Sequence, residues 1–186
     1  MRAYLTTIGE RTTNICKEQL IRCGFDVVIF DKVEPWIDKY KRFLDIANED
    51  CLRIDADIIL CKNAKKYIEN EIYYHNDLRC TDGWLFGFTL FDFYRNDLYF
   101  GSPVFYTKQA LDIMKKNIDR VSELRPEVSM SRLPEITSHY IVCHKVIGMH
   151  GFFQNKDAVD RAMENKIKRG QMDLYDFELV NKILNI

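Results

Sequence analysis

One short stretch decides the fold prediction: CLRIDADIIL, residues 51–60. Its apolar residues are typical of a buried strand, and two carboxylates, Asp55 and Asp57, stand toward its end. If one strand runs through both, their side chains project on the same side, because successive side chains alternate between the two faces of a sheet. Open sheets bind ligands beyond the carboxyl ends of their strands, so we expect Asp55 and Asp57 at a ligand-binding edge.

The residues before this stretch alternate between strand and helix patterns. The strand patterns are AYLTTI (3–8) and FDVVIF (25–30), and the helix patterns cover residues 11–23 and 35–47. Thr12 or Thr13 is a suitable N-cap for the first helix, and Gly24 is a suitable stop. Strands connected by crossover helices run parallel, so this half of the chain predicts a parallel sheet.

The residues after the stretch differ in character. Aromatic and β-favouring residues dominate positions 83–106, and a turn signal at 95–97 divides them into an antiparallel hairpin. The further elements expected are a helix from Thr107, a functional loop at 125–134, a strand at 139–148 and amphipathic helices at 156–169 and 173–184. The whole pattern predicts one three-layer α/β domain over residues 1–186. Its central sheet is mainly parallel, helices cover both faces, and the second half contains an antiparallel part.

Composition limits the classes of function. The 27 Lys and Arg residues nearly balance the 28 Asp and Glu residues, so the chain lacks the large positive field that attracts nucleic acid. No apolar run approaches the roughly 20 residues that span a bilayer, and the start of the chain lacks a signal-peptide pattern. We therefore expect a cytoplasmic protein without a membrane span, in which the six scattered cysteines are reduced thiols.

Two carboxylates at a sheet edge favour a hard cation. Mg²⁺ and Mn²⁺ take oxygen ligands and bridge carboxylates to phosphate oxygens, which neutralises a diphosphate leaving group. The structural alternative is that Asp55 and Asp57 only cap and solvate a strand end. Their position after the third strand of a parallel series favours the ligand site.

The motif and its position resemble the nucleotide-diphospho-sugar transferases of the A-type glycosyltransferase fold, whose Asp-X-Asp motif holds a metal and the donor diphosphate. The resemblance rests on RIDADII (53–59), TTIGERTT (6–13), GSPVFYTKQAL (101–111) and GMHGFFQ (148–154). It implies an Mn²⁺ or Mg²⁺ cofactor, with Asp55 nearer the ribose and Asp57 as the firmer metal ligand. It also implies that His150 completes the metal shell, whereas His139 and His144 lie within the expected strand, where structural histidines are common.

The same resemblance places the nucleotide base and ribose against the loop Thr6–Arg11. Gly9 lets the backbone approach a ligand, Thr7 offers a hydrogen bond, and Arg11 near a helix start can meet a phosphate. Thr6 and Asp55 belong to the same expected donor-binding set. The alternative is an ordinary strand-to-helix loop with a capping threonine.

A catalytic base is expected only if the anomeric configuration is inverted. Glu127 is the leading candidate, because it follows the helix after GSPVFY, where inverting family members carry an acidic residue. Their usual Glu-Asp pair is absent here, which leaves the stereochemistry open. Asp82 is the second candidate, with a turn-forming aspartate as its structural alternative.

The sequence thus predicts a metal-dependent glycosyltransferase that moves a sugar from a uridine or guanosine diphosphate sugar to a hydroxyl acceptor. Residues 1–60 would form the nucleotide-binding half, residues 80–155 the acceptor-side half, and residues 156–186 the C-terminal helices. The chain is short for such an enzyme and leaves little room for a separate acceptor domain, so we expect a partner, a homo-oligomer or a large exposed acceptor. The alternatives are a nucleotide-sugar-binding module without transfer and a nucleotidyltransferase, although the Gly-rich basic loop of a triphosphate site is absent.

Overall fold

The computed structural model describes residues 1–31, 36–78, 84–93, 96–123, 125–152, 154 and 164. Asp82 therefore lies outside the described residues, as do the helices expected at 156–169 and 173–184 apart from residue 164. Among the described helices, none has the length and apolar character that a bilayer crossing requires.

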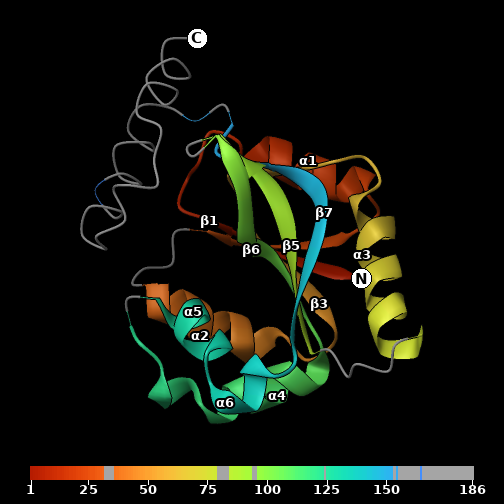
Figure 1. The fold of residues 1–186 in the computed structure, drawn as a ribbon. Helices are drawn as coiled ribbons and strands as arrows, with labels where there is room; N and C mark the ends of the chain where they lie inside the picture. Colours follow the sequence, from red (N-terminus) through yellow and green to blue (C-terminus); the bar gives the residue numbers. More distant parts are fainter. Residues whose placement is uncertain are drawn as a thin grey trace.

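The first half of the chain forms the parallel part of the sheet, as the strand and helix patterns predict (Figure 1). Its elements are β1 (Arg2–Thr7), α1 (Thr13–Arg22), β2 (Asp26–Asp31), α2 (Trp36–Ile46) and β3 (Cys51–Asp55). β1 pairs in parallel with β2 on one side and with β3 on the other. Thr6 stands opposite Asp55 in this register, so the ends of β1 and β3 meet at one edge.

The prediction of one strand over residues 51–60 is wrong. β3 ends at Asp55, Ala56 and Asp57 form a turn, and β4 (Ile58–Leu60) is a separate strand. Two residues distant in sequence stabilise this turn. The Ala56 N–H donates to the Thr6 carbonyl (2.9 Å), and the Thr12 hydroxyl donates to the Ala56 carbonyl (2.7 Å). Strand alternation therefore does not relate Asp55 to Asp57.

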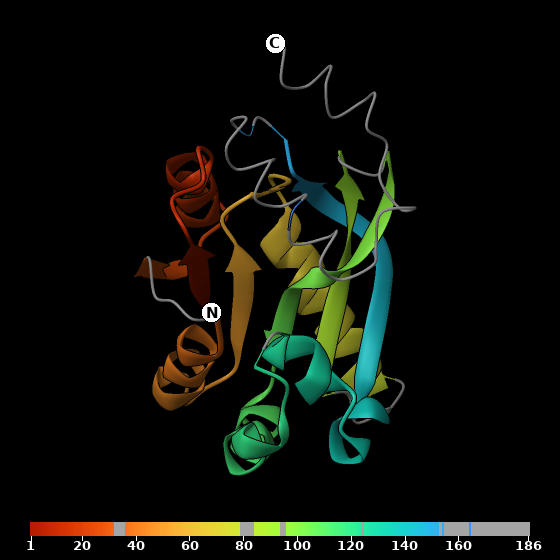
Figure 2. The same cartoon turned by 90° about the vertical axis from the view of Figure 1, so that its left-hand side faces the viewer.

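The second half closes the sheet on itself. β5 (Leu85–Asp92) and β6 (Asp97–Tyr106) form the predicted antiparallel hairpin, and β7 (Tyr140–His150) runs parallel to β5. The strand order is β2-β1-β3-β6-β5-β7-β4, with β4 antiparallel to β7. Only two residues separate β3 from β4 in the chain, yet three strands separate them in the sheet. The sheet must therefore curl, and Figures 1 and 2 show this curvature in β5, β6 and β7.

Helices cover both faces of the sheet, as predicted. α1 and α3 (Ala64–Tyr73) bury residues such as Leu20 and Ile68 in one core with the strands. The helices of the second layer are α2, α4 (Lys108–Lys116), α5 (Pro126–Ser131) and α6 (Pro134–Thr137). They share the other core, which includes Phe43 and Met114 (Figure 1).

Three helices correct the sequence prediction. α3 was not anticipated, and it continues into a π-helical turn at Tyr74–Leu78. The expected loop at 125–134 is largely replaced by α5 and α6, each of which begins with a proline at the favoured first turn. Met130 and Ile136 anchor these short helices by complete burial in the core.

The predicted helix boundaries depend on local backbone chemistry. The Thr107 side chain accepts a hydrogen bond from the Ala110 N–H (3.2 Å) and so caps α4 as expected. Gly24 follows α1 with a φ of +86°, a conformation that glycine adopts without a steric penalty. Thr12 precedes α1, but its hydroxyl does not cap the helix, because it bonds the Ala56 carbonyl instead.

Gly148 controls how closely β4 approaches β7, and it supplies a test of the curled sheet. A Cβ added there would lie 2.5 Å from the Ile59 carbonyl oxygen and 3.0 Å from the Leu60 Cα. Gly148→Ala should therefore lower the free energy of unfolding by about 1–3 kcal/mol, the usual cost of overpacking. Urea unfolding measures this loss. Val146→Ala, at an exposed position of the same strand, should change it by less than about 0.5 kcal/mol, and equal effects would contradict the packing of β4 on β7.

Candidate functional site

Asp55 is a tightly held anion at the carboxyl end of β3. Its Oδ1 accepts a hydrogen bond from the Thr6 hydroxyl (2.5 Å) and one from the Arg53 guanidinium (3.0 Å). Burial by itself raises the pKa of Asp55, but the charge of Arg53 and the bond from Thr6 outweigh it, so the pKa lies below its usual value. Asp55 therefore stays ionised, and its Oδ1 is committed to partners within the protein.

Arg53 links Asp55 to a cavity on the side of α5. Its side chain is 3% exposed, and its guanidinium lies over the Trp36 ring, 4.9 Å from the centroid. The cavity has a volume of about 80 Å³, and Arg53, Tyr106, Glu127 and Tyr140 are among its lining residues. One carboxylate oxygen of Glu127 accepts a hydrogen bond from the Trp36 Nε1 (2.6 Å). Glu127 therefore lines the same cavity as Arg53, whose guanidinium binds Asp55.

Asp57, His150 and Asp92 form an ion-pair network where β3, β5 and β7 end. His150 Nε2 is 3.1 Å from Asp57 Oδ2, and His150 Nδ1 is 3.2 Å from Asp92 Oδ2. Strand pairing enforces this contact, because His150 stands opposite both Asp92 of β5 and Ile58 of β4. The Gly151 N–H also donates to the Asp57 carbonyl (3.0 Å), which fixes the turn against the end of β7.

This network makes His150 a cation at neutral pH. Burial alone lowers the pKa of His150, but the charges of Asp57 and Asp92 and the contacts with them reverse the effect and raise the pKa from 6.5 to about 10. The side chains of His150, Asp57 and Asp92 are 17%, 23% and 3% exposed, so water screens these charges poorly.

Tyr99 of β6 covers the network. Its ring stacks on the His150 ring at 5.3 Å with an interplanar angle of 23°. Burial and the charges of Asp55 and Asp57 raise the pKa of the Tyr99 hydroxyl above its usual value, so this hydroxyl keeps its proton. Gly101 leaves room for the ring, since a Cβ there would lie 3.1 Å from the Tyr99 hydroxyl oxygen.

The loop after β1 is organised by its own side chains. The Thr7 hydroxyl donates to the Glu10 carboxylate (2.6 Å) and accepts from the Gly9 N–H (2.9 Å), and the Ile8 N–H also donates to Glu10 (2.8 Å). Gly9 has a φ of +98°, and the space beside its Cα is open. The loop thus presents a bare backbone surface at Gly9, with Arg11 exposed beyond it.

Several predicted site residues meet, and others do not. Thr6 contacts Asp55, and Asp57 contacts His150, at the same edge of the sheet. Glu127 lies apart from these contacts, in a cavity that it lines together with Arg53, which binds Asp55. Among the other histidines, His139 stacks on Trp84 at 3.7 Å, and His144 packs edge-on against Phe100 at 5.8 Å.

The structure adds three residues that the sequence analysis missed. Asp92 is a single carboxylate at the end of an aromatic strand, and such a charge requires a buried partner. Lys39 occupies a core position of α2, where it is 1% exposed and donates to the Thr7 carbonyl (3.0 Å). Gln154 donates to the Thr12 hydroxyl (2.7 Å) and so ties the segment after β7 to the start of α1. A charged residue in an apolar repeat was the signal that could have identified Asp92 and Lys39.

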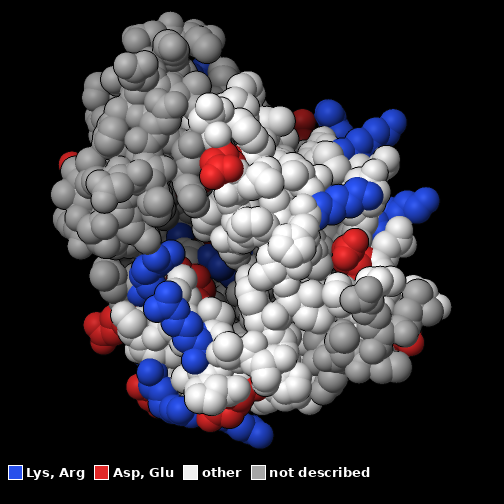
Figure 3. All heavy atoms as spheres, viewed as in Figure 1, with Lys and Arg blue, Asp and Glu red and all other residues white. Residues whose placement is uncertain are grey.

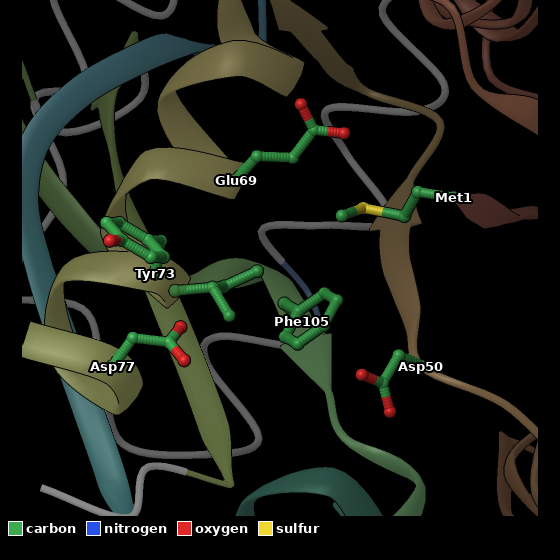
Figure 4. A pocket seen from close by; sticks show the side chains of 7 residues that line it. Met1, Asp50, Glu69, Tyr73, Asp77 and Phe105 are labelled. Carbon is green, nitrogen blue, oxygen red and sulfur yellow. The ribbon is translucent and has the colours of Figure 1, made fainter. Parts of the chain in front are cut away.

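A wider cavity lies elsewhere and contains none of these residues. It has a volume of about 300 Å³ and lies between α3 and the start of β1, with Met1, Asp50, Glu69, Tyr73 and Phe105 among its lining residues (Figure 4). The face of the molecule in Figure 3 carries Lys and Arg side chains interspersed with Asp and Glu side chains. This mixture agrees with the balanced charge of the sequence.

The donor set at Asp57 fits a hard divalent cation. Asp57 Oδ1 is buried and accepts no hydrogen bond from the described residues, which makes it an available carboxylate ligand. His150 Nε2 faces the Asp57 carboxylate. Asp92 forms an ion pair with His150 Nδ1, as carboxylates commonly do for metal-binding histidines. A cation bound at Nε2 would replace the proton that His150 carries.

Comparisons with known proteins show a shared fold. No family model matches the chain, and no curated protein matches its sequence. A197 from STIV is 12% identical with a TM-score of 0.56, over 81% of this chain and 85% of that one. The 4-diphosphocytidyl-2C-methyl-D-erythritol synthase from Anaerococcus prevotii is 8% identical with a TM-score of 0.50, over 91% and 98%. A glycosyltransferase involved in the glycosylation of the major capsid of PBCV-1 is 16% identical with a TM-score of 0.45, over 77% and 83%.

The charge on His150 can be measured directly. In metal-free buffer its imidazole should remain protonated through neutral pH and lose its proton near pH 10, because Asp57 and Asp92 stabilise the cation. Its contribution to stability is then complete below about pH 6.5 and declines as the pH rises toward 10. NMR titration of the ring protons, assigned with His150→Gln, gives the midpoint. Asp92→Asn should lower it, and a wild-type midpoint at or below 6.5 would contradict the network.

Proposed function

We propose that this chain transfers a glycosyl group from a nucleoside-diphosphate sugar to a hydroxyl acceptor, with a divalent cation at Asp57 and His150. One observation carries the proposal: the buried Oδ1 of Asp57 has no hydrogen-bond partner among the described residues and stands at the sheet edge formed by β1 and β3. A carboxylate left with an unused buried oxygen beside a partly buried histidine is typical of a metal site.

In this proposal the loop after β1 receives the nucleotide. Gly9 offers an open backbone surface against which a base or ribose can lie. The buried Lys39 ammonium supports this loop by donating a hydrogen bond to the Thr7 carbonyl. Thr6 belongs to the supporting structure, because its hydroxyl is committed to Asp55 and to the Ile54 carbonyl. Arg11 lies beyond Gly9 on the exposed side, where its charge can approach a phosphate.

The metal-binding groups are arranged to act on the diphosphate. A divalent cation, when bound, would neutralise the charge that develops on the diphosphate as its bond to the anomeric carbon breaks. Asp57 supplies Oδ1, and Asp92 orients His150 so that Nε2 faces Asp57. Asp55, fixed by Thr6 and Arg53, contributes a permanent negative charge beside this position.

The acceptor side lies at Glu127. Its carboxylate lines the cavity of about 80 Å³, and the Trp36 Nε1 orients one of its oxygens. In an inverting reaction the acceptor oxygen forms a bond to the anomeric carbon as the diphosphate bond breaks, and Glu127 accepts the hydroxyl proton. Arg53 joins the two halves of the site, since it binds Asp55 and also lines the Glu127 cavity.

Asp57→Asn tests the cation site. The change keeps the shape of the side chain but removes the charge that holds a hard cation, so turnover should fall by roughly a thousandfold or more. Stability without ligand should fall by only about 1–3 kcal/mol, because Asp92 still partners His150. Sugar release from uridine and guanosine diphosphate sugars in Mn²⁺ measures turnover, and thermal unfolding measures stability.

Ligand-induced stabilisation separates this site from a structural role. Mn²⁺ with a nucleoside diphosphate should raise the melting temperature of the wild type and of Asp45→Asn, an exposed aspartate of α2, but not that of Asp57→Asn. Stabilisation that persists in Asp57→Asn would overturn the proposal. The product identifies the reaction class, because pyrophosphate released from a nucleoside triphosphate and a sugar phosphate would indicate nucleotidyl transfer, and ligand binding without turnover would indicate a binding module.

Glu127→Gln tests the acceptor base. Glutamine keeps the oxygen that accepts from Trp36 but cannot take a proton, so kcat should fall about 10²- to 10⁴-fold while donor binding is unchanged. Glu123→Gln, at an exposed position just before α5, is the matched control and should leave both unchanged. A wild-type kcat in Glu127→Gln would exclude Glu127 as the base.

A further inference from the structure

Three potential metal ligands meet on the side of the sheet that α3 covers. Glu71 and His75 lie one helical turn apart on α3 and its π-helical extension, and Cys143 lies on β7. One ligand atom from each residue lies within 4.8 Å of the other two, and His75 Nε2 is 3.9 Å from Glu71 Oε2. No sequence motif links Cys143 to the other two, which are about 70 positions away.

The local structure favours a defined site over a chance contact. Cys143 is 2% exposed, His75 has a 19% exposed side chain, and Glu71 has a 31% exposed side chain, so the cluster runs from the core to the surface. The rings of Tyr74 and Phe86 flank His75 at 5.3 and 6.1 Å. The helix also changes from α to π geometry at this position, a feature that often marks functional sites in helices.

This cluster is separate from the other features of the molecule. The residues of α3 and its extension that line the wider cavity are Glu69, Ile72, Tyr73 and Asp77, and none of Glu71, His75 and Cys143 is among its lining residues. Cys143 precedes His150 by seven residues on β7, so the cluster lies away from the end of the strand where Asp57 and His150 meet.

We propose that Glu71, His75 and Cys143 form a zinc-binding site that clamps α3 to β7. Thiolate and imidazole select borderline-soft ions such as Zn²⁺ over Mg²⁺ and Mn²⁺, and a carboxylate completes a known type of ligand set. Tetrahedral Zn²⁺ needs these ligand atoms roughly 3.3–3.6 Å apart, so the cluster must contract by about 1 Å, which the part-exposed Glu71 side chain allows. Water on the exposed side supplies the fourth ligand.

Zinc binding changes the state of the Cys143 thiol. Burial, together with the charge of Glu71, raises its pKa to about 12, so the thiol keeps its proton when no ion is bound. Binding forms the Zn–S bond and releases that proton to solvent, with no change in oxidation state. The positive charge of the bound ion also offsets the repulsion between the Glu71 carboxylate and the Cys143 thiolate.

Cobalt reports this site directly, because Co²⁺ bound to thiolate gives a charge-transfer band in the near ultraviolet. The metal-free chain titrated with Co²⁺ should develop this band at one equivalent, and Zn²⁺ should abolish it. Cys143→Ala should lose the band, whereas Cys51→Ala, which removes another fully buried strand cysteine, should keep it. Asp57→Asn should also keep the band, which separates this site from the proposed donor site.

A second variant guards against loss of folding. Glu71 is partly exposed, so Glu71→Gln leaves the core intact. It should weaken Co²⁺ binding by at least about tenfold, the minimum loss typical of altered metal sites. Zn²⁺ should raise the melting temperature of the wild type and of Cys51→Ala but not of Cys143→Ala. Absence of the band in the wild type, or its persistence in folded Cys143→Ala, would overturn the proposal.

Discussion

The imidazolium of His150 lies between two carboxylates, and the candidate donor site depends on that arrangement. Asp57 comes from the turn after β3, Asp92 from the end of β5, and His150 from the end of β7, so one charge network joins three strand ends. Removing one member of a buried ion pair commonly costs about 3–5 kcal/mol, because an uncompensated charge remains. The curled sheet makes the contact possible, since it returns β7 to within reach of the turn that follows β3.

Arg53 neutralises Asp55, just as His150 neutralises Asp57 and Asp92. Its guanidinium neutralises Asp55, lies over Trp36 and lines the cavity that contains Glu127, although the side chain is almost fully buried. At the edge of the sheet the carboxylates Asp55, Asp57 and Asp92 contact the cations Arg53 and His150, and the charge of Glu10 lies near Asp57. A divalent cation that displaced the His150 proton would add one positive charge there and improve the match to an anionic diphosphate.

Much of the fold was predictable because it depends on local patterns. The alternation of strands and helices up to residue 51 requires parallel pairing, and Gly24 and Thr107 mark helix boundaries through their own backbone and side-chain chemistry. The break at Asp55 was not predictable in this way, because IDADII alternates apolar and acidic residues and so continues the strand pattern. Two hydrogen bonds of Ala56, one donated to the Thr6 carbonyl and one accepted from the Thr12 hydroxyl, both more than 40 positions away, bend the chain there.

The same division applies to the candidate site. By itself the sequence determined that Asp55 stands toward the end of a strand and that the loop after the first strand contains Gly9, because both follow from local periodicity and residue type. The family resemblance implied that His150 joins Asp57, but only the tertiary structure decided that Asp92 completes the network and that Cys143 approaches Glu71 and His75. The physical reason is that these contacts depend on the curl of the sheet and on strand register between distant segments, and neither is encoded in the periodicity of any one segment.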